Sequence, residues 1–256
     1  MPPKAPAQRE AVKYQIQERF EKHVLNRVPN LDGYNPHHDG AEGDWLTRAM
    51  GLEPNAHNAP DFLGFEMKKG SKGKTTFGDW SPNSSLYKAP NKQIERDDFI
   101  QLFGMPNPKR DDRSSWSGSV FPKVGHTNFA GQIIEVDLKG NILINYTLKN
   151  DTRVQKIAII QRFPKRTTIE LARWDSSSIK DKVENKFGDF GWFRCLKDKR
   201  GRYQALQFGP PLKYRTFLEF FQRGEIFIDC GMHQGNKRPY MAWRATNQIW
   251  DALAEK

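Results

Sequence analysis

The sequence contains little cysteine and no long hydrophobic run, and both absences exclude classes of protein. Its 256 residues include two cysteines, Cys195 and Cys230, too few for a disulfide framework or for a zinc site built from cysteine alone. No stretch approaches the roughly 18 consecutive apolar residues of a membrane-spanning helix. The first residues lack the apolar run of a secretory signal. These features predict a cytoplasmic protein.

Positive charge is in excess, and aromatic residues are plentiful. Lysine and arginine number 41 against 30 aspartate and glutamate residues, which gives a formal net charge of +11. Such an excess predicts a polyanionic partner, with nucleic acid first and an anionic membrane surface second. The 17 Phe and 7 Trp residues argue against disorder, because disordered chains have few aromatic residues.

Hydrophobic periodicity predicts an α/β protein whose second half is rich in strands. Apolar residues four apart, from Val12 to Val24, lie on one face of a predicted helix. Further helices are expected at 40–51, 94–103, 176–187, 214–222 and 246–253. Strands are expected at 62–68, 75–77 (returning after a Gly- and Lys-rich turn), 133–138, 142–146, 157–160, 168–172, 190–196, 203–208, 226–229 and 240–243.

The segment 106–125 is polar and rich in Pro, Ser and Arg. This composition indicates a connection between two lobes or a mobile loop. We therefore expect an N-terminal region, residues 1–110, with the first helix and the candidate catalytic residues, and a second region, residues 111–256, with the remaining sheet and the DNA-recognition residues. One domain with two lobes is the alternative.

Acidic and basic residues cluster at the first predicted strand, in residues 60–68. Because side chains alternate along a strand, Glu66 and Lys68 share one face, about 7 Å apart, and the apolar residues beside them point into a core. Asp61 lies just upstream, before a glycine at which the chain can turn. Two carboxylates can therefore converge with an ammonium beside them.

Two carboxylates next to an ammonium suit hydrolysis of a phosphodiester with Mg²⁺. This ion prefers hard oxygen ligands and completes its shell with water and phosphate oxygens, and it lowers the pKa of a bound water. Lys68 would orient or activate that water, or stabilise charge in the transition state. Nearby carboxylates favour its protonated form unless burial opposes them, which favours the electrostatic role. The spacing alone also occurs at solvated strand ends, so a structural role stays open.

The segment Pro-Asp-Phe-Leu-Gly-Phe-Glu-Met-Lys-Lys, with Thr-Thr-Phe after it, resembles the PD-(D/E)xK nucleases. Within them it is most similar to the branch that holds the MutH repair nickase and the MvaI and BcnI restriction endonucleases. The close match spans about residues 40–82, and 224–244 resembles the branch more loosely. The resemblance implies a mixed central β-sheet flanked by helices, with a strand-rich DNA-recognition portion. It also implies that Asp61 and Glu66 are metal ligands and that Lys68 is the catalytic lysine.

One position departs from the pattern of that branch. Its members carry a glutamate in the helix before the motif, and that glutamate joins the site, whereas Thr47 occupies the position here. Glu42 or Asp44 could substitute from a neighbouring turn, or the site uses fewer ligands.

Basic residues beside the motif and near the C-terminus are candidates for contacts with DNA. Those beside the motif, which could hold phosphates around the scissile bond, are Lys69, Lys72 and Lys74. Those near the C-terminus are Arg238 and Arg244, and the aromatic Tyr240 between them is a further candidate for DNA contact. A guanidinium reads guanine bidentately in the major groove, and binding of phosphate by these arginines is the alternative.

The sequence as a whole predicts a Mg²⁺-dependent type II restriction endonuclease that cleaves double-stranded DNA at a short specific sequence. We expect a monomer or weak dimer, and a cognate DNA methyltransferase in the same host that is not bound to it. A MutH-like nickase would share the chemistry but cut one strand. A non-catalytic basic DNA-binding protein, whose carboxylates only pair with lysines, would cleave nothing. The recognition sequence and the roles of the histidines, including His37 and His38, stay open.

Overall fold

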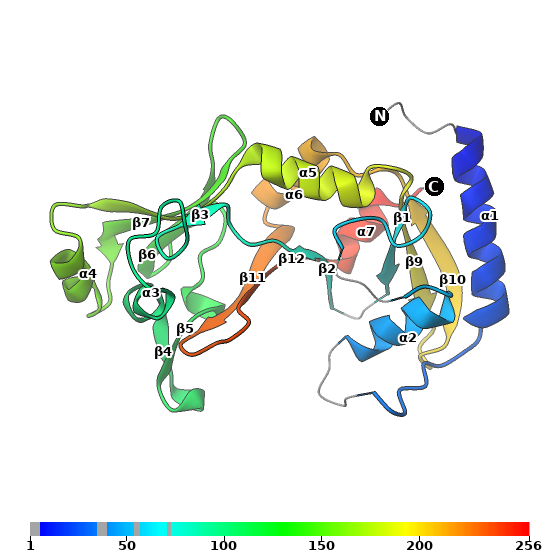
Figure 1. The fold of residues 1–256 in the computed structure, drawn as a ribbon, viewed down its shortest axis with the longest axis horizontal. Helices are drawn as coiled ribbons and strands as arrows, with labels where there is room; N and C mark the ends of the chain where they lie inside the picture. Colours follow the sequence, from blue (N-terminus) through cyan, green and yellow to red (C-terminus); the bar gives the residue numbers. More distant parts are fainter. Residues whose placement is uncertain (1–5, 35–39, 54–56, 71–72, 256) are drawn as a thin grey trace. The chain divides into compact units, whose positions relative to one another are not determined.

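The computed structural model describes residues 6–34, 40–53, 57–70 and 73–255, which form a mixed α/β fold (Figure 1). The helices are α1 (Pro6–His23), α2 (Ala41–Ala49), α3 (Arg96–Phe103), α4 (Lys156–Arg162), α5 (Ser176–Phe187), α6 (Tyr214–Gln222) and α7 (Asn247–Leu253). The strands are β1 (Phe65–Lys69), β2 (Lys74–Asp79), β3 (Ser84–Ser85), β4 (Met105–Asn107), β5 (Arg113–Trp116), β6 (Ala130–Val136), β7 (Ile142–Asp151), β8 (Thr168–Trp174), β9 (Gly191–Lys197), β10 (Tyr203–Gly209), β11 (Ile226–His233) and β12 (Tyr240–Thr246). The predicted fold class is confirmed.

The chain forms two compact units, each assembled from separate stretches of sequence. Unit 1 comprises the described residues within Met1–Thr75, Asp181–Tyr214 and Thr246–Lys256, and unit 2 those within Thr76–Lys180 and Arg215–Ala245. The sequence analysis places the catalytic residues in residues 1–110 and the DNA-recognition residues in 111–256. This division of functions stays a prediction.

Unit 1 is built on a three-stranded mixed sheet with the order β1-β9-β10. Strand β1 runs parallel to β9, so that Glu66 lies opposite Trp192 and Lys68 opposite Arg194. Strands β9 and β10 form the predicted antiparallel pair. The parallel pairing joins residues more than a hundred positions apart, and it places Glu66 and Lys68 beside a strand from the second half of the chain.

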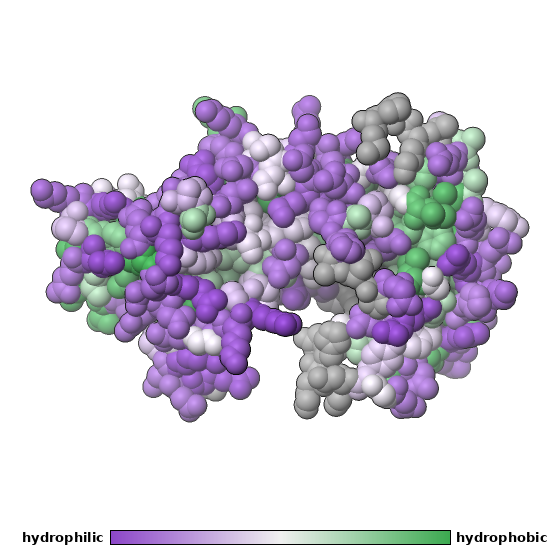
Figure 2. All heavy atoms as spheres, in the orientation of Figure 1, coloured by the Kyte–Doolittle hydropathy of each residue, from purple (hydrophilic) through white to green (hydrophobic). Residues whose placement is uncertain are grey.

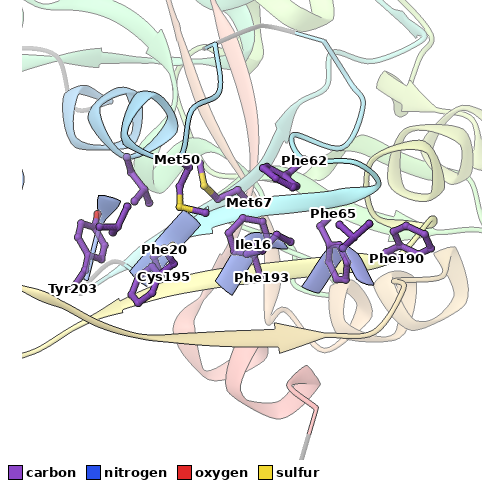
Figure 3. Close-up of a cluster of buried hydrophobic side chains, with 13 residues drawn as sticks. Ile16, Phe20, Met50, Phe62, Phe65, Met67, Phe190, Phe193, Cys195 and Tyr203 are labelled. Carbon is purple, nitrogen blue, oxygen red and sulfur yellow. The ribbon is translucent and has the colours of Figure 1, made fainter. Parts of the chain in front are cut away.

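One face of this sheet is a hydrophobic core. Ile16 and Phe20 of α1 pack over Phe65 of β1 and Phe193 of β9 (Figure 3). The four-residue spacing on α1 is that of one helix face, as predicted. The apolar residues of β1 point into this core, so the alternation of a strand sends Glu66 and Lys68 to the opposite face.

The opposite face of the sheet is covered by α7 and the C-terminal end of α5. The ring of Trp250 in α7 packs edge-on against Trp192, with ring centroids 4.9 Å apart, and also contacts Phe187 of α5. The sheet therefore has helices on both faces, and the charged residues of β1 lie under the second helical layer.

Unit 2 contains the four-stranded sheet β3-β8-β7-β6 and most of the five-stranded sheet β2-β12-β11-β5-β4. Its core is rich in tryptophan. The carbonyl oxygen of Trp80 accepts hydrogen bonds from the indole N–H groups of Trp174, at 2.8 Å, and Trp243, at 3.1 Å. The strand that returns after the motif exists as β2, but it pairs with β12, whereas β1 pairs with β9.

The prediction of a strand at 157–160 is wrong, because these residues form α4. Ile159 and Phe163 are buried, whereas Ile157 is 62% exposed. The two buried residues are four positions apart, which is the spacing of one helix face. The packing of this face outweighs the preference of β-branched residues for strands.

The prediction of a loop at 106–125 is also wrong. This segment contains β5, which pairs with β11. The indole N–H of the buried Trp116 donates a hydrogen bond to Gln132 Oε1 at 2.7 Å. Its polar residues lie along β4, at the edge of the sheet, and along β5, which pairs with β4 on one side and with the distant β11 on the other. Composition alone does not reveal this pairing.

Among the residues that the structure describes, no helix combines the length and the apolar character needed to cross a membrane. Hydrophilic residues cover most of the face shown in Figure 2.

Candidate active site

Glu66 and Lys68 form a buried ion pair on β1. Their side chains are two residues apart on the same face, and Lys68 Nζ donates to Glu66 Oε1 at 2.6 Å. Glu66 is 2% exposed and Lys68 9%. The predicted shared face is therefore confirmed, and both charges lie away from bulk water.

A tight turn brings Asp61 to the same strand. Phe62 and Phe65 exchange two backbone hydrogen bonds, of 2.9 and 2.8 Å. Gly64 within the turn has a φ of +104°, and a Cβ there would lie 2.8 Å from the ring of Phe190, so this position requires glycine. Asp61 Oδ2 accepts a hydrogen bond from the N–H of Met67 at 3.0 Å.

A second lysine reaches the same carboxylate. Lys186, in the last turn of α5, places Nζ 3.2 Å from Glu66 Oε1. Both ammonium groups therefore approach one oxygen of Glu66. The other oxygen, Oε2, is buried and has no hydrogen-bond partner among the described residues.

Burial and the neighbouring charges shift the pKa values of this cluster in opposite directions. Burial raises the pKa of the Glu66 carboxyl from 4.5 to about 7; Lys68 and Lys186 oppose the rise, and Asp61 adds to it. Burial lowers the pKa of the Lys68 ammonium, and the charge of Glu66 opposes that change. A low-dielectric site thus favours the neutral form of each partner, and a cation at Glu66 would favour the carboxylate.

The donor set fits a hard divalent cation. Asp61 and Glu66 supply carboxylate oxygens, and the buried Oε2 of Glu66 is an acceptor without a donor, which is costly unless a proton or cation meets it. Within the described part of the chain, no three side chains of the metal-binding types gather at one place. Two protein carboxylates, with the rest of the shell from water and phosphate, are a common arrangement for Mg²⁺.

Thr47, at the position of the expected glutamate, and Glu42, one of its two possible substitutes, both have partners of their own. Thr47 Oγ1 donates to the carbonyl oxygen of Gly43 at 2.8 Å, inside its own helix. Glu42 Oε1 accepts hydrogen bonds from Lys197 Nζ at 2.7 Å and from the hydroxyl of Tyr203 at 2.8 Å. Glu42 therefore contacts β9 and β10 at the wall of a cavity of about 580 Å³ that Gly70 and Arg194 also line.

The predicted DNA-binding residues are divided between the units. Lys69 ends β1 and Lys74 begins β2; Lys72, like His37 and His38, lies outside the described residues, as does the side chain of Lys69.

In unit 2, Arg238 is exposed in the loop between β11 and β12. The ring of Tyr240, at the start of β12, covers the backbone of Gly231. Arg244 forms an ion pair with Asp229 on the neighbouring strand, with Nε and Oδ2 3.2 Å apart. The structure thus brings together Asp61, Glu66 and Lys68 within unit 1 and places the C-terminal set on the β11–β12 pair.

Sequence reasoning missed Lys186. Nothing in its local sequence marks it, because it is one lysine in a polar helix. The available signal was indirect: α5 leads directly into the strand 190–196, and a parallel pairing of that strand with 62–68 would have placed the end of the helix over the motif.

The comparison with known families decides the identity of the chain. The model of the LlaMI restriction endonuclease family matches residues 26–256. The chain belongs to this family.

Individual relatives agree with this assignment. The chain is 37% identical over 261 residues to the type II restriction enzyme ScrFI of Lactococcus lactis subsp. cremoris, with 94% of this chain and 96% of ScrFI covered. The fold resembles that of the restriction endonuclease MvaI in its complex with cognate DNA, with a TM-score of 0.62, 13% identity and 98% of each chain covered. The resemblance drawn from the motif and the prediction of a type II restriction endonuclease are both confirmed.

Proposed function

We propose that this member of the LlaMI restriction endonuclease family hydrolyses both strands of duplex DNA with Mg²⁺, and that Asp61 and Glu66 hold the ion while Lys68 is the catalytic lysine. The observation that carries the proposal is the convergence of these three side chains on one strand and its turn. Lys68 Nζ lies 2.6 Å from Glu66, and Asp61 is bonded to the same strand.

Each residue has a distinct part in the proposed reaction. Bound Mg²⁺ would polarise a phosphoryl oxygen and lower the pKa of a bound water. Glu66 Oε2, a buried acceptor that no described donor meets, is the natural ligand atom. Lys68, held in place by Glu66, offers a buried ammonium that stabilises negative charge as it develops on the phosphoryl group.

Recognition is assigned to the second group of residues. ScrFI is named as a type II restriction enzyme and MvaI was solved with its cognate DNA, which supports double-stranded DNA as the substrate here. We assign phosphate contacts to Lys69, Lys72 and Lys74 and base contacts to Arg238, Tyr240 and Arg244. The protein would act as a monomer or weak dimer, and a methyltransferase of the same specificity would protect the host DNA.

The decisive experiment is digestion of a supercoiled plasmid with purified protein and Mg²⁺, followed by sequencing of the ends. We expect linear fragments with a common end sequence. Glu66→Gln and Lys68→Met should lose cleavage by at least about 100-fold, since several kcal/mol of transition-state stabilisation disappear. Glu53→Gln, which removes an exposed carboxylate elsewhere in unit 1, is the matched control and should cleave normally.

Two outcomes would contradict the proposal and indicate a different function. Accumulation of nicked circles without linear product would indicate a MutH-like nickase. Binding of duplex DNA with steep salt dependence, without cleavage at any Mg²⁺ concentration, would indicate a non-catalytic DNA-binding protein.

A further inference from the structure

Lys186 is held at the candidate site by a well-anchored helix. The buried side chains of Val183 and Phe187 fix the C-terminal end of α5, and Asn58 Nδ2 donates to the carbonyl oxygen of Lys182 at 2.9 Å. The Lys186 side chain is 15% exposed. Because other residues hold the helix, its ammonium is not needed for packing, and its four-carbon stem gives it freedom to leave Glu66.

The charges of the cluster balance when no cation is bound. The charged side chains that act on Glu66 within the described residues are Lys68, Asp61 and Lys186. Two carboxylates therefore face two ammonium groups. Removal of either ammonium would leave a buried negative charge uncompensated, which is unfavourable in a site of low dielectric.

The neighbouring arginine does not supply this charge. Arg194 lies opposite Lys68 on β9, but its guanidinium is engaged by the Asp251 carboxylate and by Gln207 Oε1, 2.9 Å from its Nε. Among the described residues, Lys186 is thus the second cation that meets Glu66, and it approaches the same oxygen as Lys68.

We propose that Lys186 is a positioning residue that neutralises Glu66 in the metal-free site and competes with the incoming cation for that carboxylate. A divalent ion at the free Oε2 of Glu66 would lie close to the ammonium on Oε1, and the repulsion between the two positive charges weakens metal binding before substrate arrives. This inference rests on the proposed function, since it requires Glu66 to be a metal ligand. A lysine that served only to pack α5 would have no such effect.

The test is titration of the DNA-free protein with Mn²⁺, with free ion measured by electron paramagnetic resonance. The titration is carried out at about pH 8.5, so that the carboxylates are ionised in every variant. Lys186→Met should bind Mn²⁺ at least about threefold more tightly than the wild type, because a like charge near the ion is removed. Lys186→Arg keeps the charge and should not gain affinity. Lys180→Met removes an exposed charge from the same helix and should leave the affinity unchanged.

The possible results separate the two proposals. If the wild type binds Mn²⁺ and Glu66→Gln does not, Glu66 is a ligand, and equal or weaker binding by Lys186→Met would then overturn the role of Lys186 alone. If the wild type itself binds no Mn²⁺ that depends on Glu66, the proposed metal site fails and the inference with it. Thermal unfolding checks that each variant is folded, and Lys186→Gln, neutral and polar, replaces Lys186→Met if that variant does not fold.

Discussion

Asp61 and Met67 are joined by a hydrogen bond of 3.0 Å between the carboxylate and a backbone N–H. The bond ties the turn before β1 to the strand that carries Glu66 and Lys68. Asp61 lies outside the strand, but this hydrogen bond fixes its carboxylate against the backbone of β1. This arrangement allows the charge of Asp61 and its structural bond to be tested separately.

Asp61→Asn should lose cleavage by at least about 100-fold while the protein stays as stable as the wild type. The amide oxygen can still accept the Met67 hydrogen bond, but the charge that attracts a divalent cation is gone. Asp61→Ala should lose cleavage equally and also destabilise the fold by about 1 kcal/mol, since the bond disappears. Single-turnover cleavage and urea unfolding measure the two effects. Normal cleavage by Asp61→Asn would contradict the assignment of Asp61 as a ligand.

The stability of the metal-free protein should fall as pH rises from about 5 to about 7. The folded pKa of Glu66 is about 7 and its ordinary value 4.5, so between these values the folded state binds a proton that the unfolded state has released. Rising pH therefore favours unfolding, by up to roughly 3 kcal/mol.

Urea unfolding in the presence of a chelator, across that pH range, measures this effect. Glu66→Gln is the reference, because its side chain does not titrate, and the difference between the two proteins isolates Glu66. Adding Mg²⁺ at about pH 8 should restore stability to the wild type and leave Glu66→Gln unchanged. If the metal-free wild type instead gains stability relative to Glu66→Gln as pH rises, the sign of the prediction is wrong.

Glu42→Ala should reduce stability without abolishing cleavage. Its half-buried carboxylate accepts hydrogen bonds from Tyr203 and Lys197, and loss of this acceptor costs about 1 kcal/mol. Plasmid cleavage at a temperature well below unfolding should stay within about threefold of the wild type. A loss of more than about 100-fold in a folded variant would instead make Glu42 the third carboxylate of the site.

Arg238→Ala should weaken cleavage of the preferred sequence by about 1–3 kcal/mol and relax the choice of base at one position, if its guanidinium reads a base edge. Lys237→Ala, at the exposed neighbouring position, should weaken binding to all sequences alike. Cleavage of a randomised library by both variants distinguishes them. If Arg238→Ala lowers binding uniformly, this arginine contacts phosphate.

Much of the site could be predicted from sequence because its chemistry is local. Asp61, Glu66 and Lys68 lie within eight positions of one another, and the alternation of a strand is enough to place two of them on one face. The resemblance to a nuclease family then supplied the roles. The local sequence also predicted α1, from apolar residues four apart, as well as α5 and the β9–β10 pair.

Other features depended on distant residues and were missed. The helix α4 was predicted as a strand because the β-branched residues around Ile159 favour strands, and the helix forms because that side chain and Phe163 find a core. The pairing of Trp116 with Met232 turned an apparent loop into part of a sheet.

By itself, the sequence determined the family resemblance and with it the predicted class of chemistry, since the residues that carry the resemblance are neighbours in the chain and need no distant partner to be recognised. Only the tertiary structure decided how those charges are balanced. Lys186 is 120 positions from Glu66 in the sequence, and it meets that carboxylate because β1 pairs in parallel with β9 and α5 leads into β9. Charge interactions in a low-dielectric site depend on distances in space, and those distances exist only once the sheet has formed.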